Sequence, residues 1–225
     1  MEDFVHKQHY RPWAGVSAPA VLREFYHEYG SLQKYPKNTA IITHGGQVKY
    51  RYFLEEGLCY YTVTFKQGRE NTSAIFLSGS TISLYAGTIS GSVLTLNGCT
   101  LYAVPINIFR QHVYTNAVLA ELHEHQITSW LSGALLGGIL NAQLEVEERI
   151  AIFLQMMAKE TKAEVESGYH SVGHKISHEF ISHFVSANRV TVSKTMSAWQ
   201  KDRHIILHDG VIAVSADMYN ADLYR

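Results

Sequence analysis

The residues best suited to chemistry lie near the end of the chain, in the run SANRVTVSKTMSAWQKDRHI at 186–205. If 189–202 is a helix, its apolar residues recur at helical spacing and share one face, as Val192, Met196 and Trp199. A different face carries a guanidinium, hydroxyls and an ammonium, from Arg189, Ser193, Ser197 and Lys194. Such groups hydrogen-bond to phosphate oxygens and to base edges. The run therefore predicts a helix that packs along one stripe and offers the other to a partner.

The charge of the chain points to a local basic surface and not to a global one. The 225 residues carry a net charge of -1, which gives no general signal for nucleic-acid binding. Between 168 and 208, however, five Lys or Arg stand against two Asp or Glu, with six His in addition. This distribution is typical of a phosphate-binding surface. An ordinary solvated helix surface is the alternative.

The neighbouring elements are those that would position this helix. Asn188 stands at its N-cap, and a shorter amphipathic helix capped by Ser177 precedes it across the turn 186–188. After it, HIILHDGVIAV has two β-rich arms around Asp209-Gly210, a strong hairpin signal. Helix, tight turn, helix and hairpin together predict a winged helix-turn-helix, whose second helix enters the major groove of DNA.

The preceding part of the chain changes its residue pattern once, from β-rich runs to helical spacing. From Lys37 to about Val104, short β-rich runs punctuated by glycine predict a sandwich or barrel, with a hairpin turn at KQGRE. From Asn107 to about Ala158 helical spacing takes over. The predicted apolar face of one long helix comprises Val118, Leu122, Ile127, Trp130, Leu131, Ala134, Leu135 and Ile139. Gly133, Gly137 and Gly138 within it predict close approach of a second helix, as at a dimer seam, or a bend.

Other features bound the function. Cys59 and Cys99 have no CxxC spacing, which predicts two buried free thiols in a reducing compartment. The N-terminus has no signal-peptide pattern and no apolar run reaches membrane-spanning length, so we expect a cytoplasmic location. No metal site or cofactor is expected. His170, His174 and His178 recur every four residues, but the glycines and the Ser177 cap argue against one continuous helix. The pair in HEH at 123–125 points apart on a helix.

The order of these motifs resembles the cyclic-AMP receptor protein and fumarate–nitrate reduction regulator (Crp/Fnr) family of bacterial transcription regulators. The run at 176–205 fits the family's helix-turn-helix without a gap, RIAIFL at 149–154 matches the first helix of its DNA-binding domain, and 37–57 matches its β-roll opening. The resemblance implies an α+β chain. A β-roll sensor domain, similar to cyclic-nucleotide-binding domains, would span 1–115, a dimerisation helix 116–143, and a winged-helix DNA-binding domain 144–225.

The resemblance also implies a homodimer, formed through 116–143, on a pseudo-palindromic site in double-stranded DNA, with RNA polymerase as a further partner. Arg189 would read a base edge, while Thr191 and Ser193 would contact phosphates and Lys194 a base or phosphate. Val190 stands where many members of the family have Glu. In having Val at this position, the chain is similar to the family's halorespiration regulators. Because Val can pack on a thymine methyl, we expect A/T-rich half-sites. The residues expected at DNA are Ser177, His178, Arg189, Val190, Thr191, Ser193 and Lys194.

The effector is expected to differ from cyclic AMP. The stretch at 79–96 has neither acid nor base where the family's cyclic-nucleotide binders carry Glu and Arg, so a buried phosphate would be uncompensated. Ala134 and Leu135 stand where adenine-contacting Thr and Ser are expected. An aromatic or phenolic effector is predicted instead, in a pocket formed by Tyr85, Thr88, Ser90, Tyr102, Trp130 and Leu135. Ordinary core packing of these aromatic residues is the alternative.

Two other functions stay open. A cupin-like β-barrel enzyme would need several metal ligands inside the barrel, where the strand region offers His44 with Glu55, Glu56 or Glu70. No Ser-His-Asp, phosphate-loop or paired-carboxylate arrangement accompanies them. A haem- or metal-dependent sensor is the second alternative, since the chain has 13 His. An iron–sulfur cluster is excluded, because two cysteines cannot ligate one within a subunit.

Overall fold

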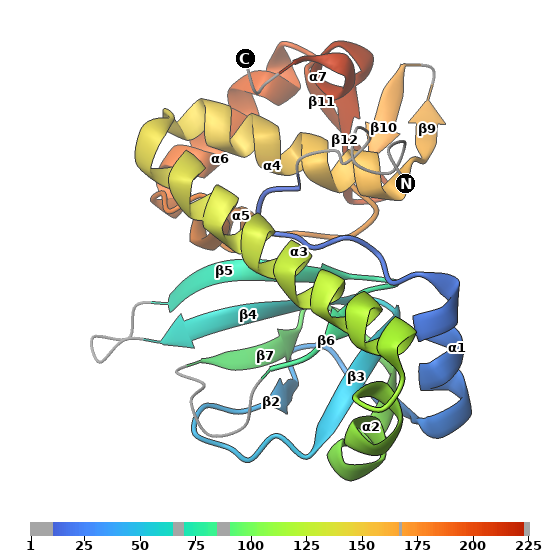
Figure 1. Ribbon diagram of the computed structural model, residues 1–225. Helices are drawn as coiled ribbons and strands as arrows, with labels where there is room; N and C mark the ends of the chain where they lie inside the picture. The colour runs from blue at the N-terminus through green and yellow to red at the C-terminus, as the bar shows by residue number, and fades with distance from the viewer. Residues whose placement is uncertain (1–10, 65–69, 85–90, 167, 223–225) are drawn as a thin grey trace. The chain divides into compact units, whose positions relative to one another are not determined.

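The computed structural model describes residues 11–64, 70–84, 91–166 and 168–222 (Figure 1). The chain divides into two compact units, Met1–Leu136 and Gly137–Arg225. The first carries most of the strands and the second carries the helix-turn-helix, which confirms the predicted α+β class. None of the helices in the described ranges is long and apolar enough to cross a membrane.

The first unit is a two-layered β-structure, as predicted. Its described strands form two four-stranded sheets, ordered β1-β8-β3-β6 and β2-β7-β4-β5, and every pairing is antiparallel. The strands are β1 (Ser31–Tyr35), β2 (Ala40–Ile42), β3 (Tyr50–Glu56), β4 (Leu58–Thr64), β5 (Glu70–Leu77), β6 (Thr81–Ile82), β7 (Ser92–Thr95) and β8 (Cys99–Pro105). Thr64 pairs with Glu70 across the predicted hairpin, whose tip at 65–69 is outside the described residues.

The two faces of the β1-β8-β3-β6 sheet support two separate cores. Leu54 and Leu101 point into one, where they meet Cys59 and Phe76 from the other sheet. Since neighbouring residues of a strand point to opposite faces, Phe53 lies in the second core. There it packs against helices α1 (Ala20–Tyr29) and α2 (Ile106–Val113), which cover that face.

The segment before α1 is an element that the sequence did not predict. Its residues 12–14 form a turn and an isolated bridge, which lie between β5 and helix α3 (Ala117–Gln143). The Trp13 N–H donates to the Gly133 carbonyl at 2.7 Å, and the Ile75 N–H donates to the Trp13 carbonyl at 2.7 Å. A Cβ on Gly133 would overlap the Ala14 carbonyl oxygen. Gly133 therefore allows this segment of its own chain to approach α3 closely. The sequence alone had predicted a dimer seam or a bend at this glycine instead.

The predicted single apolar face of α3 is wrong, because the helix divides its apolar residues among several directions. The Trp130 ring stacks on Phe76 of β5, with centroids 5.8 Å apart, and Leu122 packs on the second core. Figure 1 shows α3 crossing the layer that contains β4 and β5. Four residues of the predicted face are instead about half exposed or more: Val118, Leu131, Leu135 and Ile139. A helix that is apolar on more than one side gives no unique face from spacing alone.

The second unit combines helices with a small sheet ordered β11-β12-β10-β9. Its elements are α4 (Val146–Thr161), β9 (Glu164–Glu166), β10 (Tyr169–Ser171), α5 (His178–Phe184), α6 (Arg189–Lys201), β11 (Ile205–His208), β12 (Val211–Ser215) and α7 (Ala216–Asn220). Glu145 and Glu148 form a capping box at the start of α4. Asp209 and Gly210 take the positive φ values of 52° and 76° that a tight hairpin requires. The predicted winged helix-turn-helix is thus confirmed.

Candidate nucleic-acid interface

Two side-chain caps set where the helices of the helix-turn-helix begin. The Ser177 Oγ accepts from the Phe180 N–H at 3.0 Å, and the Asn188 Oδ1 accepts from the Val190 N–H at 2.8 Å. Both caps were predicted from sequence, and both are confirmed. Between the helices, Ser186 has a φ of 47° and the Ala187 N–H donates to the Ser182 carbonyl at 3.0 Å. The turn is therefore tight and defined on both sides.

The inner face of α6 is fixed by a buried apolar seam. Val192 and Met196 are at most 3% exposed, and Phe180, Ile181 and Phe184 of α5, which contacts α6, are also buried. The Phe184 ring lies 5.2 Å from that of Phe153 on α4. This seam determines which side of α6 turns outward.

The end of α5 is also held by hydrogen bonds from neighbouring elements. The Arg149 Nη1 donates to the Val185 carbonyl at 2.7 Å, and the Asn141 Nδ2 donates to the Phe184 carbonyl at 2.7 Å. A cation at a helix C-terminus is favourable, because the last carbonyls carry partial negative charge. The turn that leads into α6 thereby gains a second anchor.

The outer face of α6 forms an open groove of about 530 Å³, lined by Arg189, Val190, Ser193, Lys194 and Ser197. The Arg189, Val190 and Lys194 side chains are exposed. The groove presents a guanidinium, an ammonium, two hydroxyls and one aliphatic side chain. Those groups can pair with base edges, phosphate oxygens and a thymine methyl group.

The structure brings together four of the seven residues predicted to contact DNA, namely Arg189, Val190, Ser193 and Lys194, and adds Ser197. Ser177 is exposed, but its hydroxyl is engaged in the α5 cap. His178 lies behind the groove, where its Nδ1 is 3.0 Å from the Ser193 Oγ and so orients that hydroxyl. Thr191 is exposed beside the groove and not among its lining residues.

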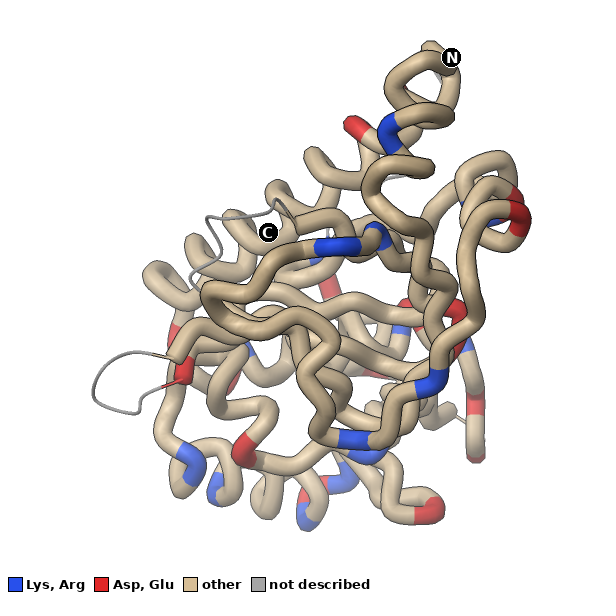
Figure 2. Tube along the Cα trace, turned by 90° about the horizontal axis from the view of Figure 1, so that it is seen from below, with Lys and Arg blue, Asp and Glu red and all other residues tan. Residues whose placement is uncertain are grey.

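The second unit carries further basic side chains outside the groove. Lys175 extends beside Gly210 at the tip of the β11–β12 hairpin, and Lys201 and Arg203 are exposed at the end of α6. Elsewhere along the described trace, Lys and Arg are interspersed with Asp and Glu (Figure 2). The positive charge is therefore a local property, as the counts in the sequence predicted.

The residues predicted to bind an effector are not brought together where the structure describes them. The Tyr102 ring packs 4.2 Å from His27 of α1, whereas the Trp130 ring stacks on Phe76. Leu135 is 67% exposed. Tyr85, Thr88 and Ser90 lie outside the described residues.

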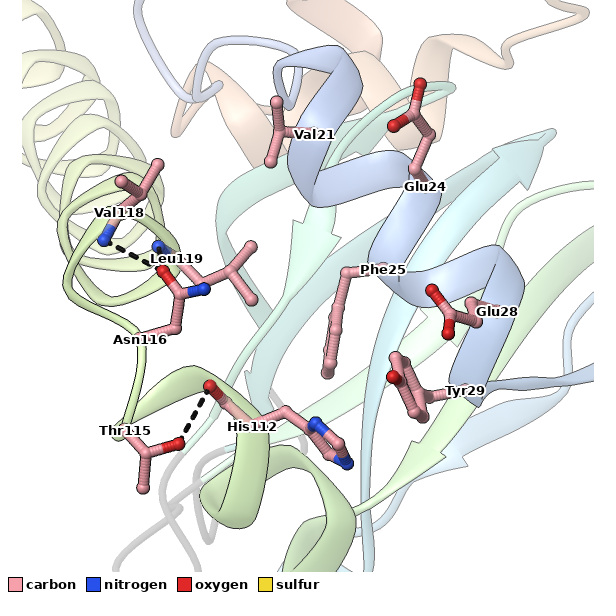
Figure 3. Close-up of a pocket in the computed structure, with 10 residues that line it drawn as sticks. All are labelled: Val21, Glu24, Phe25, Glu28, Tyr29, His112, Thr115, Asn116, Val118 and Leu119. Atoms are coloured by element: carbon pink, nitrogen blue, oxygen red, sulfur yellow. Dashed lines mark hydrogen bonds between the residues drawn. The ribbon is translucent and has the colours of Figure 1, made fainter.

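A different hollow lies between α1, α2 and the start of α3 (Figure 3). It measures about 560 Å³ and is lined by Val21, Glu24, Phe25, Glu28, Tyr29, His112, Thr115, Asn116, Val118 and Leu119. Figure 3 shows the two carboxylates on α1, across the hollow from Val118 and Leu119. No sequence motif pointed to this hollow, because its lining residues come from α1 and, far along the chain, from α2, α3 and their connection.

Two sets of residues considered for metal or redox chemistry can also be placed. Within the described ranges, no group of three or more His, Cys, Asp or Glu side chains comes together as a metal site requires. Cys59 and Cys99 are buried free thiols, as predicted, with Sγ atoms 3.7 Å apart in the core of the first unit. The hydrogen bond with Cys99 and burial both raise the pKa of the Cys59 thiol.

Comparisons with known proteins agree with this architecture. A family model, the Crp-like helix-turn-helix domain, matches residues 148–216. No curated protein matches the chain by sequence.

Several solved structures share its fold. The regulator CLP of Xanthomonas campestris is 17% identical, with a TM-score of 0.69 over 88% of this chain and 99% of that one. FixK2 of Bradyrhizobium japonicum is 16% identical, with a TM-score of 0.72 over 83% and 92%. CprK in complex with OCPA is 16% identical, with a TM-score of 0.66 over 93% and 95%.

The matched helix-turn-helix domain and the shared fold favour a DNA-binding protein over the enzyme alternative. The matched domain contains the caps, the buried seam and the outward groove described above. Residues 148–216 therefore match a Crp-like helix-turn-helix domain, and the chain shares its fold over most of its length with solved structures such as CLP and FixK2.

Proposed function

We propose that the chain acts as a homodimer that places the groove-bearing face of α6 into the major groove of a pseudo-palindromic DNA site. The observation that carries this proposal is the division of α6 into a buried face and an open one. The open face holds Arg189 and Lys194 with no acidic side chain among its lining residues. A helix packed this way can approach DNA without rearranging its own core.

Each groove residue has a distinct task in this proposal. Arg189 reads a guanine edge, a contact worth about 1–3 kcal/mol of discrimination. Val190, which is 59% exposed, packs on a thymine methyl and favours A/T-rich half-sites. Lys194 contacts a base or phosphate, and Thr191 and Ser193 contact phosphates. Ser177 and His178 approach the backbone from the start of α5.

The proposed dimer forms through α3. Leu131, Leu135 and Ile139 are exposed at spacings of four residues and so lie along one side of the helix. Gly138 belongs to the same stripe, and a Cβ there would meet no atom of another element within 4 Å among the described residues. A second α3 packed on this stripe would bury apolar surface now open to water. The domain boundaries proposed from sequence, 1–115, 116–143 and 144–225, assign this helix to dimerisation.

A small molecule is proposed to modulate DNA binding. Two solved structures of the same fold are regulated or bound by small molecules. CLP is described as responsive to c-di-GMP, and CprK is bound to OCPA. For this chain we propose an aromatic or phenolic compound and not cyclic AMP, because 79–96 has no acid or base. RNA polymerase is the proposed protein partner at the promoter.

The DNA contacts can be tested by selecting a duplex from a random pool and titrating variants against it. Arg189→Ala should weaken the selected site by about 10- to 100-fold while binding to unrelated DNA changes little. Lys194→Ala should reduce the slope of log affinity against log salt by about one. Lys34→Ala, which removes an exposed charge from β1, is the matched control. If Arg189→Ala and Lys194→Ala bind like Lys34→Ala, α6 does not read DNA.

The dimer can be tested by sedimentation. Leu135→Glu should dissociate it, because a carboxylate would be buried in an apolar seam. Leu32→Glu is the control, since Leu32 is 53% exposed on β1. Equal masses for the two variants and the parent chain would contradict this seam. A thermal-shift screen over aromatic acids, phenols, nucleotides and haem tests the effector, because a ligand of the native state raises Tm. A rise with cyclic AMP alone would contradict the proposed class.

A further inference from the structure

One charged side chain of the first unit is buried where an apolar residue would be expected. Arg51 of β3 is only 5% exposed and points into the second core, beneath α1 and α2. Its Nη1 donates to the Leu84 carbonyl at 2.6 Å, and its Cζ lies 5.8 Å from the centre of the Phe109 ring. Neither contact supplies a negative charge.

The charge of Arg51 is not balanced by a carboxylate. No ion pair joins it to an acidic side chain in the part of the chain that the structure describes, and its Nε has no hydrogen-bond partner there. A buried ion without a counter-charge costs several kcal/mol, and the cost is recovered only when an opposite charge is close. The site is therefore incomplete as it stands.

Three further polar atoms near Arg51 are buried and also lack partners: Tyr26 Oη, Ser83 Oγ and His123 Nδ1. The Phe109 ring lies close to two of these residues, with its centre 6.1 Å from that of Tyr26 and 4.8 Å from that of His123. The Ser83 hydroxyl lies near the Tyr26 hydroxyl, and their interaction lowers the pKa of Tyr26 against the larger effect of burial. Buried polar atoms are nearly always paired, so several unpaired atoms around one cation indicate an unfilled ligand position.

The neighbouring titratable groups leave the single positive charge of Arg51 unchanged. Burial raises the pKa of Tyr26, so its hydroxyl stays protonated and cannot neutralise Arg51. Burial and the Arg51 charge lower the pKa of His123 to about 4, so its ring is neutral at physiological pH. The groups available to a ligand are thus a guanidinium N–H, two hydroxyls and a neutral imidazole.

We propose that Arg51, Tyr26, Ser83 and His123 form a buried binding site for a small monovalent anion in the first unit. A halide or an anion of similar size would accept from the Arg51 Nε–H and from both hydroxyls. Tyr26, Arg51 and His123 are each at most 5% exposed, so the bound anion would be shielded from water. The site is separate from the α6 groove and does not rest on the proposed DNA contacts.

The first experiment uses bromide as the probe, because its anomalous scattering identifies it in a crystal of the full chain. An anomalous peak within hydrogen-bond distance of the Arg51 Nε is the expected result. The proposal would be overturned if the crystal showed only water at this position, or if side chains of the protein filled it completely.

The second experiment measures binding in solution. Sodium bromide replaces sodium gluconate at constant ionic strength, and Tm is followed for the parent chain and for variants. The Tm of the parent chain should rise and then saturate, by roughly 5–11 °C at a 100-fold excess over Kd. Arg51→Leu should lose the rise while remaining folded, because it replaces a buried charge with an apolar side chain.

Two further variants separate binding from general salt effects. Arg23→Leu removes an exposed arginine that pairs with Glu55, and it should keep the full bromide response. Ser83→Ala removes one donor and should shift the midpoint to higher bromide concentration. A rise in Tm that is equal in the parent chain and in Arg51→Leu would show that bromide acts elsewhere, and would refute the site even if Arg51→Leu were more stable.

Discussion

Replacing Gly133 with alanine should destabilise the first unit, although the same change usually stabilises a helix. Its new Cβ would overlap the Ala14 carbonyl oxygen and lie 2.8 Å from the Arg11 carbonyl oxygen. Neither oxygen belongs to a side chain that can rotate away. Relief requires the segment at 11–15 to shift, which would strain its two 2.7 Å hydrogen bonds, to Gly133 and from Ile75.

The magnitude follows from three contributions. Overpacking costs about 1–3 kcal/mol, and weakening two backbone hydrogen bonds costs about 1 kcal/mol each. The gain in helix propensity from Gly to Ala offsets about 1 kcal/mol. The expected net loss in the free energy of unfolding is roughly 2–4 kcal/mol.

The assay is urea unfolding followed by tryptophan fluorescence, since Trp13 and Trp130 both lie at this junction. Gly138→Ala is the matched control in the same helix, because its Cβ would meet nothing from other elements within 4 Å in the part of the chain that the structure describes. Its sedimentation must be recorded alongside, as Gly138 lies in the proposed dimer seam. If Gly133→Ala is as stable as the parent chain or more so, the account of this close approach is refuted.

Three other changes have equally defined outcomes. Asn188→Ala removes the 2.8 Å cap of α6 and should cost about 0.5–2 kcal/mol in thermal unfolding, whereas Asn188→Asp should restore most of it. His123 has a folded pKa of about 4 against an ordinary 6.5, so the unfolded chain binds more protons as pH falls from 6.5 to 4 and stability declines across that window by at most about 3 kcal/mol. His123→Leu should flatten this decline, and an unchanged pH profile would contradict the shifted pKa. Gln155→Leu should free the C-terminal segment, whose carbonyls at Met218, Tyr219 and Ala221 accept from the Gln155 Nε2, and limited proteolysis should then cleave after α7 faster than in the parent chain.

The helix-turn-helix could be predicted from sequence because its determinants are local. Ser177 and Asn188 cap helices within three residues of themselves, and Val192 and Met196 mark the buried face by spacing alone. The outward side of α6 then follows by elimination, which explains why four of the five residues lining its groove were among those predicted to contact DNA.

The features that escaped prediction depend on distant partners. Arg51 stands in YRYF, where alternation indicates a strand but not what lies on each side of the sheet. Its burial results from α1 and α2, which come from opposite ends of the first unit. The outward stripe on α3 was merged with the inward one, because Trp130 and Leu131 are adjacent and equally apolar. The sequence pattern shows which residues are apolar. On a helix that is apolar on several sides, the elements packed around it determine which side chains are buried.

The N-terminal stretch beside α3 has a consequence for the order of events during synthesis. Val16 donates to Ser129, which the ribosome adds 113 residues later, so the early stretch has no docking site until the long helix has emerged. Contacts between such remote positions are slow to form, since the intervening loop must close first. The β-structure can fold before the N-terminal stretch docks on α3. Docking of that stretch would then be a late kinetic phase of folding.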